Sequence, residues 1–181
     1  MLSRVVDGVT ISSDWPMMFD MSAANPVKSA AAPRTAWSGL LCDSAIQVFA
    51  MMAGATVTRA EDVHPPAQVS VTGVVGIGGI LRAIFSMRCS ALSATKMASQ
   101  MLSVPIAEAE SQRSDALGEL CNIIAGDFKA RIGLAEKCML SVPTIITGGD
   151  YRIHSLMADE RLELTLLYDG EPIWIALEIR K

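Results

Sequence analysis

The sequence predicts an α+β domain in which an antiparallel sheet packs against two long helices. Alternating runs rich in Val and Ile come in pairs typical of hairpins, two long apolar segments repeat with a helical period, and strands and helices follow one another in blocks. At 181 residues the chain has room for one domain with a substantial core and an extension.

The first part of the chain mixes Ser, Ala, Pro and Met without a sustained period. We expect residues 1–36 to form an N-terminal tail or linker and residues 37–181 to form the domain. Ser38 is placed to cap a helix that runs to about Ala53, and Gly54 is placed to stop it.

The remaining elements follow from alternation, β-branched content and turn residues. In chain order we predict a short strand "ATVTR", a hairpin of "QVSVTGVVG" and "ILRAIFSMR" that turns at "GIGG", a helix over residues 91–102, a long helix over residues 111–132, and the strands "SVPTIITGG", "RLELTLLYD" and "PIWIALEIR". Asp169 and Gly170 join the last two strands, because this dipeptide favours tight hairpin turns.

An internal repeat relates the two halves of the chain. At one common offset, Asp43, Gln47, Ala50, Ala53 and Gly54 align with Asp115, Glu119, Asn122, Ala125 and Gly126, and "TGVVG" aligns with "TIITG". We therefore expect a pseudo-symmetric fold in which the two long helices are counterparts.

Charge and hydropathy exclude several classes of function. The net charge is −4 and the 15 Lys and Arg residues are scattered, which argues against a nucleic-acid partner. Gln47, Ser70 and Arg82 interrupt the apolar stretches before they reach the ~18 residues that a membrane span needs. The first residues lack the apolar segment of a signal peptide, so we expect a cytoplasmic protein.

The cysteines and histidines do not form a recognisable site. Cys42, Cys89, Cys121 and Cys138 are far apart and have no neighbouring histidine at ligand spacing, so we expect buried, reduced thiols and no metal ligands. His64 and His154 each stand alone, without a nucleophile nearby in sequence. We expect both to be structural or solvent-facing.

The stretch "SDALGELCNIIAGDF", residues 114–128, places an acid and an amide in an otherwise largely apolar helix. At 100° per residue, the large apolar side chains cluster on one side, and Asp115, Glu119, Asn122 and Gly126 lie on the other. Gly118 and Gly126 flank this polar face, although each glycine costs a helix interior about 1 kcal/mol relative to Ala. Close approach of another surface would offset that cost, so we expect the face to meet a partner.

These residues resemble those of the CheC/CheX family of chemotaxis phosphatases, in which a helix carries the pattern ExxN. Here the pattern is "DALGELCNIIAG", residues 115–126, and "SVPTIITG", "PIWIALEI" and "VSVTGVVGIGG" resemble other strands of the family. The resemblance spans about residues 37–181. It implies a pseudo-symmetric CheC/CheX-like fold.

The resemblance also implies an activity, namely dephosphorylation of the phospho-aspartate of a CheY-type response regulator. Asn122 would hold a water in line with the phosphorus, and Glu119 would bind the regulator's lysine; both are expected catalytic residues. Mg²⁺ would be supplied by the regulator, so no cofactor is expected on this chain. Asp115, Gly118, Ile123 and Gly126 are the expected partner-binding residues.

Ala50 stands at the position of the amide on the first helix and cannot orient water, so we expect a single active site. Relatives of the CheX type imply a possible homodimer through sheet edges. Two other functions stay open. One is a non-catalytic module that binds a response regulator or resembles a flagellar switch protein. The other, a nucleotide-binding enzyme built on "GVVGIGG", is disfavoured because those glycines precede a strand rather than a helix.

Overall fold

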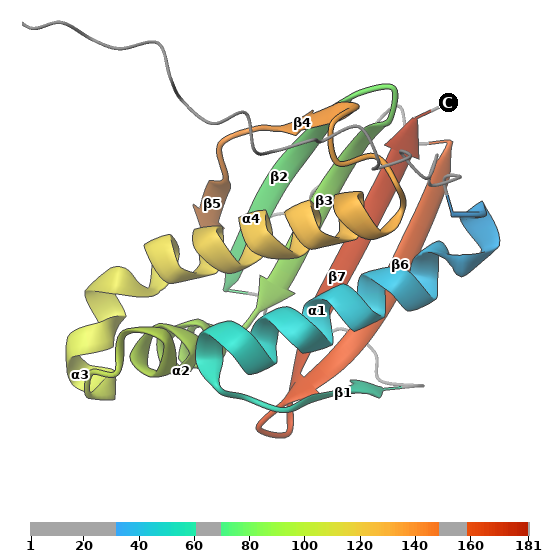
Figure 1. Cartoon of the computed structure of the whole chain (residues 1–181). Helices are drawn as coiled ribbons and strands as arrows, with labels where there is room; N and C mark the ends of the chain where they lie inside the picture. Colours follow the sequence, from blue (N-terminus) through green and yellow to red (C-terminus); the bar gives the residue numbers. More distant parts are fainter. Residues whose placement is uncertain (1–31, 61–69, 149–158, 181) are drawn as a thin grey trace, which may run out of the picture.

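The computed structural model of the chain describes residues 32–60, 70–148 and 159–180. Residues 1–31 of the predicted tail lie outside these ranges, as do both histidines. The described residues form one sheet with helices packed against it (Figure 1).

The chain alternates between strands and helices in blocks. Its elements are η1 (Arg34–Ala36), α1 (Trp37–Ala53), β1 (Val57–Ala60), β2 (Val71–Gly79), β3 (Arg82–Cys89), α2 (Ala91–Leu102), α3 (Ile106–Ala109), η2 (Glu110–Gln112), α4 (Arg113–Arg131), β4 (Cys138–Leu140), β5 (Thr144–Thr147), β6 (Glu160–Tyr168) and β7 (Glu171–Arg180). The predicted α+β class is confirmed.

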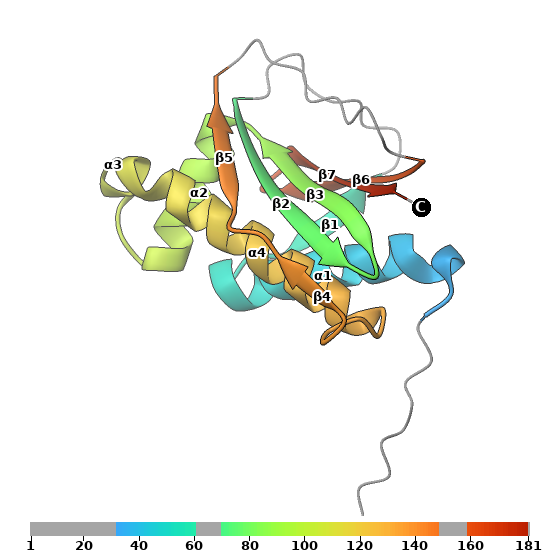
Figure 2. The ribbon, with the colours of Figure 1, turned by 90° about the horizontal axis from the view of Figure 1, so that it is seen from above.

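The sheet is antiparallel at every pairing, with the strand order β1-β6-β7-β3-β2-β4, and β5 also pairs with β2. The helices α1, α2 and α4 cover one face of it (Figures 1 and 2). The order reads symmetrically from the central β7–β3 pair outward, with β6 and β2 next and short strands at both edges. The two long helices α1 and α4 lie side by side, as the predicted pseudo-symmetry requires.

The strand part of the predicted repeat is wrong. Thr72 pairs directly with Ile146, so "TGVVG" and "TIITG" are hydrogen-bonded neighbours in β2 and β5. The counterpart of β2 by position in the sheet is β6. The connections before these two strands differ in length, so one sequence offset cannot relate both the helices and the strands.

The start of α1 differs from the prediction, whereas its end agrees. Ala36, not Ser38, is the N-cap residue, because the 3-10 turn η1 leads directly into the helix. Gly54 ends the helix with φ +59°, a left-handed conformation that glycine adopts at little cost. Residues at the end of the predicted tail pack on the domain, since Arg34 forms an ion pair with Glu160 at 2.9 Å.

The apolar side of α1 belongs to the core. The helical stretch Arg34–Ala53 is long and apolar enough to cross a membrane by length and composition, which the sequence prediction had denied. Its inner side chains, Leu41, Ala45, Val48 and Phe49, are fully buried. The packing of α1 against α4 and the sheet therefore explains why this helix is so apolar. All four cysteines are buried and free, as predicted.

The hairpins are only partly as predicted. Asp169 and Gly170 both have positive φ and join β6 to β7, which confirms the predicted turn. "GIGG" lies inside β2, and the turn to β3 comes at Ile80 and Leu81. The sequence prediction missed β4, a strand of three residues that pairs with the end of β2.

Candidate functional site

The helix α4 separates its apolar and polar residues as the periodicity predicts. Leu117, Leu120, Cys121, Ile124 and Phe128 are fully buried between the sheet and the other helices. Phe128 also meets the ring of Trp37 in α1 edge-on, with centroids 5.7 Å apart. The helix is thus anchored along its inner side, and its outer side is fixed in position.

Two neighbouring rows of residues make up the outer side of α4. At the i, i+4 spacing of a helix, one row contains Asp115, Glu119, Ile123 and Asp127, and the other contains Gly118, Asn122 and Gly126. Glu119 is exposed and Asn122 is half-buried. Because they are three residues apart, their side chains lie on the same face of the helix.

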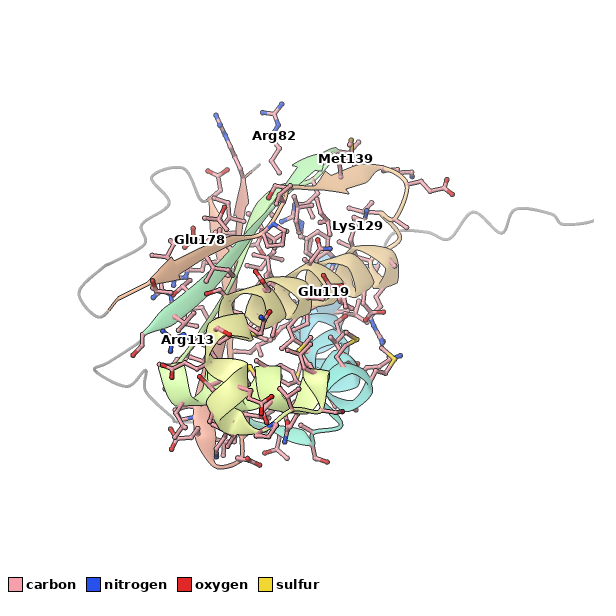
Figure 3. The ribbon with its side chains drawn as sticks, turned by 90° about the vertical axis from the view of Figure 1, so that its left-hand side faces the viewer. Arg82, Arg113, Glu119, Lys129, Met139 and Glu178 are labelled. Atoms are coloured by element: carbon pink, nitrogen blue, oxygen red, sulfur yellow. The ribbon has the colours of Figure 1, made fainter. Side chains whose placement is uncertain are left out.

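Neither Glu119 nor Asn122 makes a hydrogen bond or an ion pair with any residue in the described parts of the chain. Other polar residues near the ends of α4 are engaged: Arg113 pairs with Glu110 at 3.4 Å, and Lys129 donates to the carbonyl of Cys138 at 2.7 Å. The acid and the amide are therefore free to bind groups from outside the molecule. Figure 3 shows Glu119 on α4 and Lys129 toward the end of the same helix.

The two glycines of the second row face the chain itself. A Cβ on Gly118 would lie 3.5 Å from Pro143 and 3.7 Å from Ile145, and one on Gly126 would lie 3.7 Å from Leu140. Gly118 is buried. The prediction that these glycines clear space for a partner is wrong for Gly118, because residues 140–145 of the same chain fill that space.

The other predicted partner-binding residues vary in exposure. Asp115 is exposed in the first turn of α4, and Gly126 is half-buried. Ile123 is partly buried and packs against the hydrophobic core, so only part of its side chain is available to a partner. The structure thus leaves Asp115, Glu119, Asn122 and an edge of Ile123 on the open surface.

A glycine that the sequence analysis did not single out supports the site from below. Gly73 in β2 lies so close to α4 that a Cβ there would be 2.4 Å from the Sγ of Cys121. Real Cβ atoms do not approach this closely, so any larger residue would force Cys121 to shift. Burial raises the pKa of the Cys121 thiol well above its usual value, so the group stays protonated beside Asn122.

The corresponding positions on α1 are differently equipped. In the predicted sequence repeat, Gln47 and Ala50 align with the acid and the amide of α4, and both are exposed. Arg131 of α4 donates a hydrogen bond to the side chain of Gln47 and another to Asp127. The position on α1 that matches Glu119 is therefore occupied by a neutral side chain with an internal partner.

The arrangement on α4 suits positioning better than proton transfer. An amide both donates and accepts hydrogen bonds but does not titrate, so it can hold a water without acting as a strong base. A free carboxylate three residues away can bind a cation. In the described part of the chain, no group of three or more His, Cys, Asp or Glu residues is placed to hold a metal ion.

Several solved structures share this fold. CheX from Vibrio vulnificus has a TM-score of 0.68 at 18% identity, and the match covers 83% of this chain and 100% of that one. CheX from Desulfovibrio desulfuricans has a TM-score of 0.66 at 18% identity, covering 80% and 99%. CheX in the CheX–CheY–BeF3–Mg²⁺ complex from Borrelia burgdorferi has a TM-score of 0.66 at 20% identity, covering 80% and 98%.

These likenesses define the fold as that of the CheX and CheC-like chemotaxis proteins. The family described as "Chemotaxis phosphatase CheX" matches residues 71–166, which include the whole of α4. The chain belongs to this CheX family. No curated protein matches the sequence significantly.

Proposed function

We propose that this protein is a phosphatase that removes the phosphoryl group from the aspartate of a CheY-type response regulator. The observation that carries the proposal is the pair Glu119 and Asn122, which shares one exposed turn of α4 and has no partner in the described parts of the chain. Membership of the CheX family supports it, as does the complex with CheY formed by the relative from Borrelia burgdorferi.

Asn122 is the residue proposed to orient the attacking water. Its amide oxygen accepts a hydrogen bond from the water, and its amide nitrogen can donate to a phosphoryl oxygen. Attack on a phosphoryl group passes through a loose transition state, for which positioning matters more than base strength. The rigid anchoring of α4 through Leu120, Cys121 and Ile124 fixes the direction from which Asn122 enters.

Glu119 is proposed to bind a cation of the regulator, its active-site lysine. The carboxylate is exposed and unpaired in the described part of the chain, so docking would form a charge-assisted hydrogen bond without first breaking an internal one. Charge complementarity at such a rim mainly sets the rate and geometry of association. Glu119 would in this way place Asn122 over the phosphorus.

The proposed reaction is a hydrolysis that consumes one water. The water oxygen forms a bond to phosphorus, the bond between phosphorus and the aspartate oxygen breaks, and the products are inorganic phosphate and a free aspartate carboxylate. Mg²⁺ in the regulator's own site would neutralise charge on the phosphoryl oxygens. This chain contributes the water position and the docking charge.

The decay of phosphorylated response regulators tests the proposal. Each regulator of the source cell is phosphorylated on its receiver domain, and loss of the phosphoryl group is followed with and without this protein. Accelerated decay of at least one regulator is expected. If regulators bind but none decays faster, the protein is instead a non-catalytic binding module; if none binds, the proposed partner class is wrong.

Two further expectations belong to the same proposal. A cytoplasmic location follows from the proposed partner, and fractionation of the source cell tests it.

A homodimer is expected from the resemblance to CheX-type relatives. The described sheet ends in short strands at both edges, β1 on one side and β4 with β5 on the other. Sedimentation equilibrium of the full chain measures the assembly state.

A further inference from the structure

We infer that Val142 is a contact residue for the phosphorylated partner, packing against the rim of the phosphorylation site beside the point where Asn122 enters. The inference rests on the proposed function and deepens it. Val142 is not part of the ExxN pattern, and its side chain is 85% exposed, more than any other large hydrophobic residue in the described ranges.

The placement of Val142 follows from the glycine row of α4. Gly118, Asn122 and Gly126 follow one another at four-residue spacing, so Asn122 lies between the two glycines. Pro143 packs at Gly118 and Leu140 packs at Gly126. The two residues between these contact points, Ser141 and Val142, therefore run past Asn122.

The segment that carries Val142 is held on both sides. Ser141 donates its backbone N–H to the carbonyl of Gly76 at 2.8 Å, and its hydroxyl accepts from the N–H of Gly76 at 2.8 Å. The same hydroxyl donates to the carbonyl of Val142 at 3.0 Å. Lys129 ties the start of the segment to α4 through the carbonyl of Cys138.

A rigid segment with one exposed apolar side chain is suited to a docking contact. Ordering a flexible loop on binding costs free energy, whereas a segment already fixed by Ser141 and by α4 loses little. Burial of the Val142 side chain against a partner would exclude bulk water from the neighbourhood of Asn122. The occupant that fits is the receiver domain's surface around its phosphorylation site, because the proposed reaction brings that surface to Asn122.

Met139 provides a matched control on the same segment. It is 80% exposed and lies in β4, where it pairs with Gly78 of β2, whereas its neighbours Cys138 and Leu140 point to the helix side of the sheet. Because strand residues alternate between faces, Met139 points to the face that the helices do not cover. Figure 3 shows Met139 on β4, apart from Glu119 on α4.

The test compares Val142→Asp with Met139→Asp in the full chain. The probe is the panel of phosphorylated receiver domains used above. KM and kcat for dephosphorylation are measured, and the Kd for each phosphorylated receiver is measured in the Asn122→Ala background. Val142→Asp is expected to raise both KM and Kd at least about tenfold with little change in kcat, since one buried aliphatic side chain is worth this much. Met139→Asp should change neither.

The outcomes separate this inference from the proposed function. A rise in Kd with Val142→Asp supports the inference even if no receiver is dephosphorylated. Equal KM and Kd for Val142→Asp and the unaltered protein overturn the inference and leave the phosphatase proposal intact. Equal effects of Val142→Asp and Met139→Asp overturn it too, because a general effect of added charge would then explain the loss. If no receiver binds, both proposals fail.

Discussion

Arg131, in the last turn of α4, donates a hydrogen bond to the side-chain oxygen of Gln47 in α1, a residue 84 positions earlier in the chain. The same guanidinium is also held by Asp127. In the sequence repeat, Gln47 of α1 aligns with Glu119 of α4. The two long helices therefore differ. Among the described residues, the acid and the amide of α4 have no partner, whereas Gln47 of α1 is hydrogen-bonded to Arg131.

Installing the ExxN pattern on α1 should not create a second site. In the Asn122→Ala background, we expect Gln47→Glu together with Ala50→Asn to leave dephosphorylation at the background rate, because Arg131 would hold the new carboxylate in an ion pair. The measurement is the decay of a phosphorylated receiver domain. Restored activity would show that α1 lacks an active site only because of the residues at positions 47 and 50.

Replacing Gly73 should destabilise the domain from beneath the site. Its Cβ would lie 2.4 Å from the Sγ of Cys121, so Gly73→Ala overpacks the interface between β2 and α4. We expect a loss of about 1–3 kcal/mol in the free energy of unfolding. Urea denaturation followed by circular dichroism measures the change.

The double variant Gly73→Ala with Cys121→Ala is the control for that mechanism. Cys121→Ala removes the Sγ and leaves its Cβ at 3.6 Å, an ordinary contact distance. The loss in the double variant should therefore be smaller than the sum of the two single losses. Strict additivity would contradict the proposed clash.

The buried thiols should make the domain less stable in alkali. Desolvation raises the pKa of Cys89 from 9.0 to about 12 and raises that of Cys121 further. Unfolded thiols lose their protons near pH 9 whereas the folded ones keep them, so their stabilisation is complete below pH 9 and is lost as pH rises toward 12. Each thiol should lower the free energy of unfolding by about 1.4 kcal/mol per pH unit in this window.

Urea midpoints between pH 8 and pH 10.5 measure this dependence. Cys89→Ala should reduce the slope of stability against pH, and it should lower stability most at pH 8, where the thiol is mostly protonated in both states. An unchanged slope would mean that other groups control alkaline unfolding. Tyr168, whose pKa is raised to about 12 chiefly by burial, adds to the slope only above pH 10 and is present in both proteins.

Neutralising the acid of the site should weaken docking more than chemistry. Glu119→Gln keeps the size of the side chain and removes its charge, so we expect KM for a phosphorylated receiver to rise and its salt dependence to weaken, with kcat changing less. Glu171→Gln, at the β6–β7 hairpin, is the matched control on an exposed acid of a different element. A pure loss of kcat in Glu119→Gln would assign the carboxylate a role in the chemical step instead.

Local sequence patterns predicted the features that depend on neighbouring residues alone, such as helix faces, turns and helix ends. The inner face of α4 follows directly from helical period, the turn at Asp169 and Gly170 follows from positive φ, and Gly54 ends α1 as expected. Glu119 and Asn122 also appeared on one outer face from spacing alone. Their assigned roles came from the family resemblance, and the reaction itself stays a prediction.

Features set by distant parts of the chain could not be predicted. Nothing within "TIITG" indicates that it pairs with β2, and the three residues of β4 are too short for an alternating pattern. The role of Gly118 depends on Pro143, which lies far from it in sequence and adjacent to it in space. Without that contact, a glycine on a polar helix face indicates a partner surface.

The central claim is that Asn122 positions the water that cleaves the phospho-aspartate. The most direct measurement is a single-turnover decay of a phosphorylated receiver domain with saturating Asn122→Ala protein, accompanied by the Kd of that complex. We expect loss of most of the acceleration, at least about a hundredfold for a lost positioning group. The Kd should change by less than about threefold, since Glu119 rather than Asn122 is proposed to supply the docking charge. Decay at the unaltered rate in the Asn122→Ala complex would contradict the proposed mechanism.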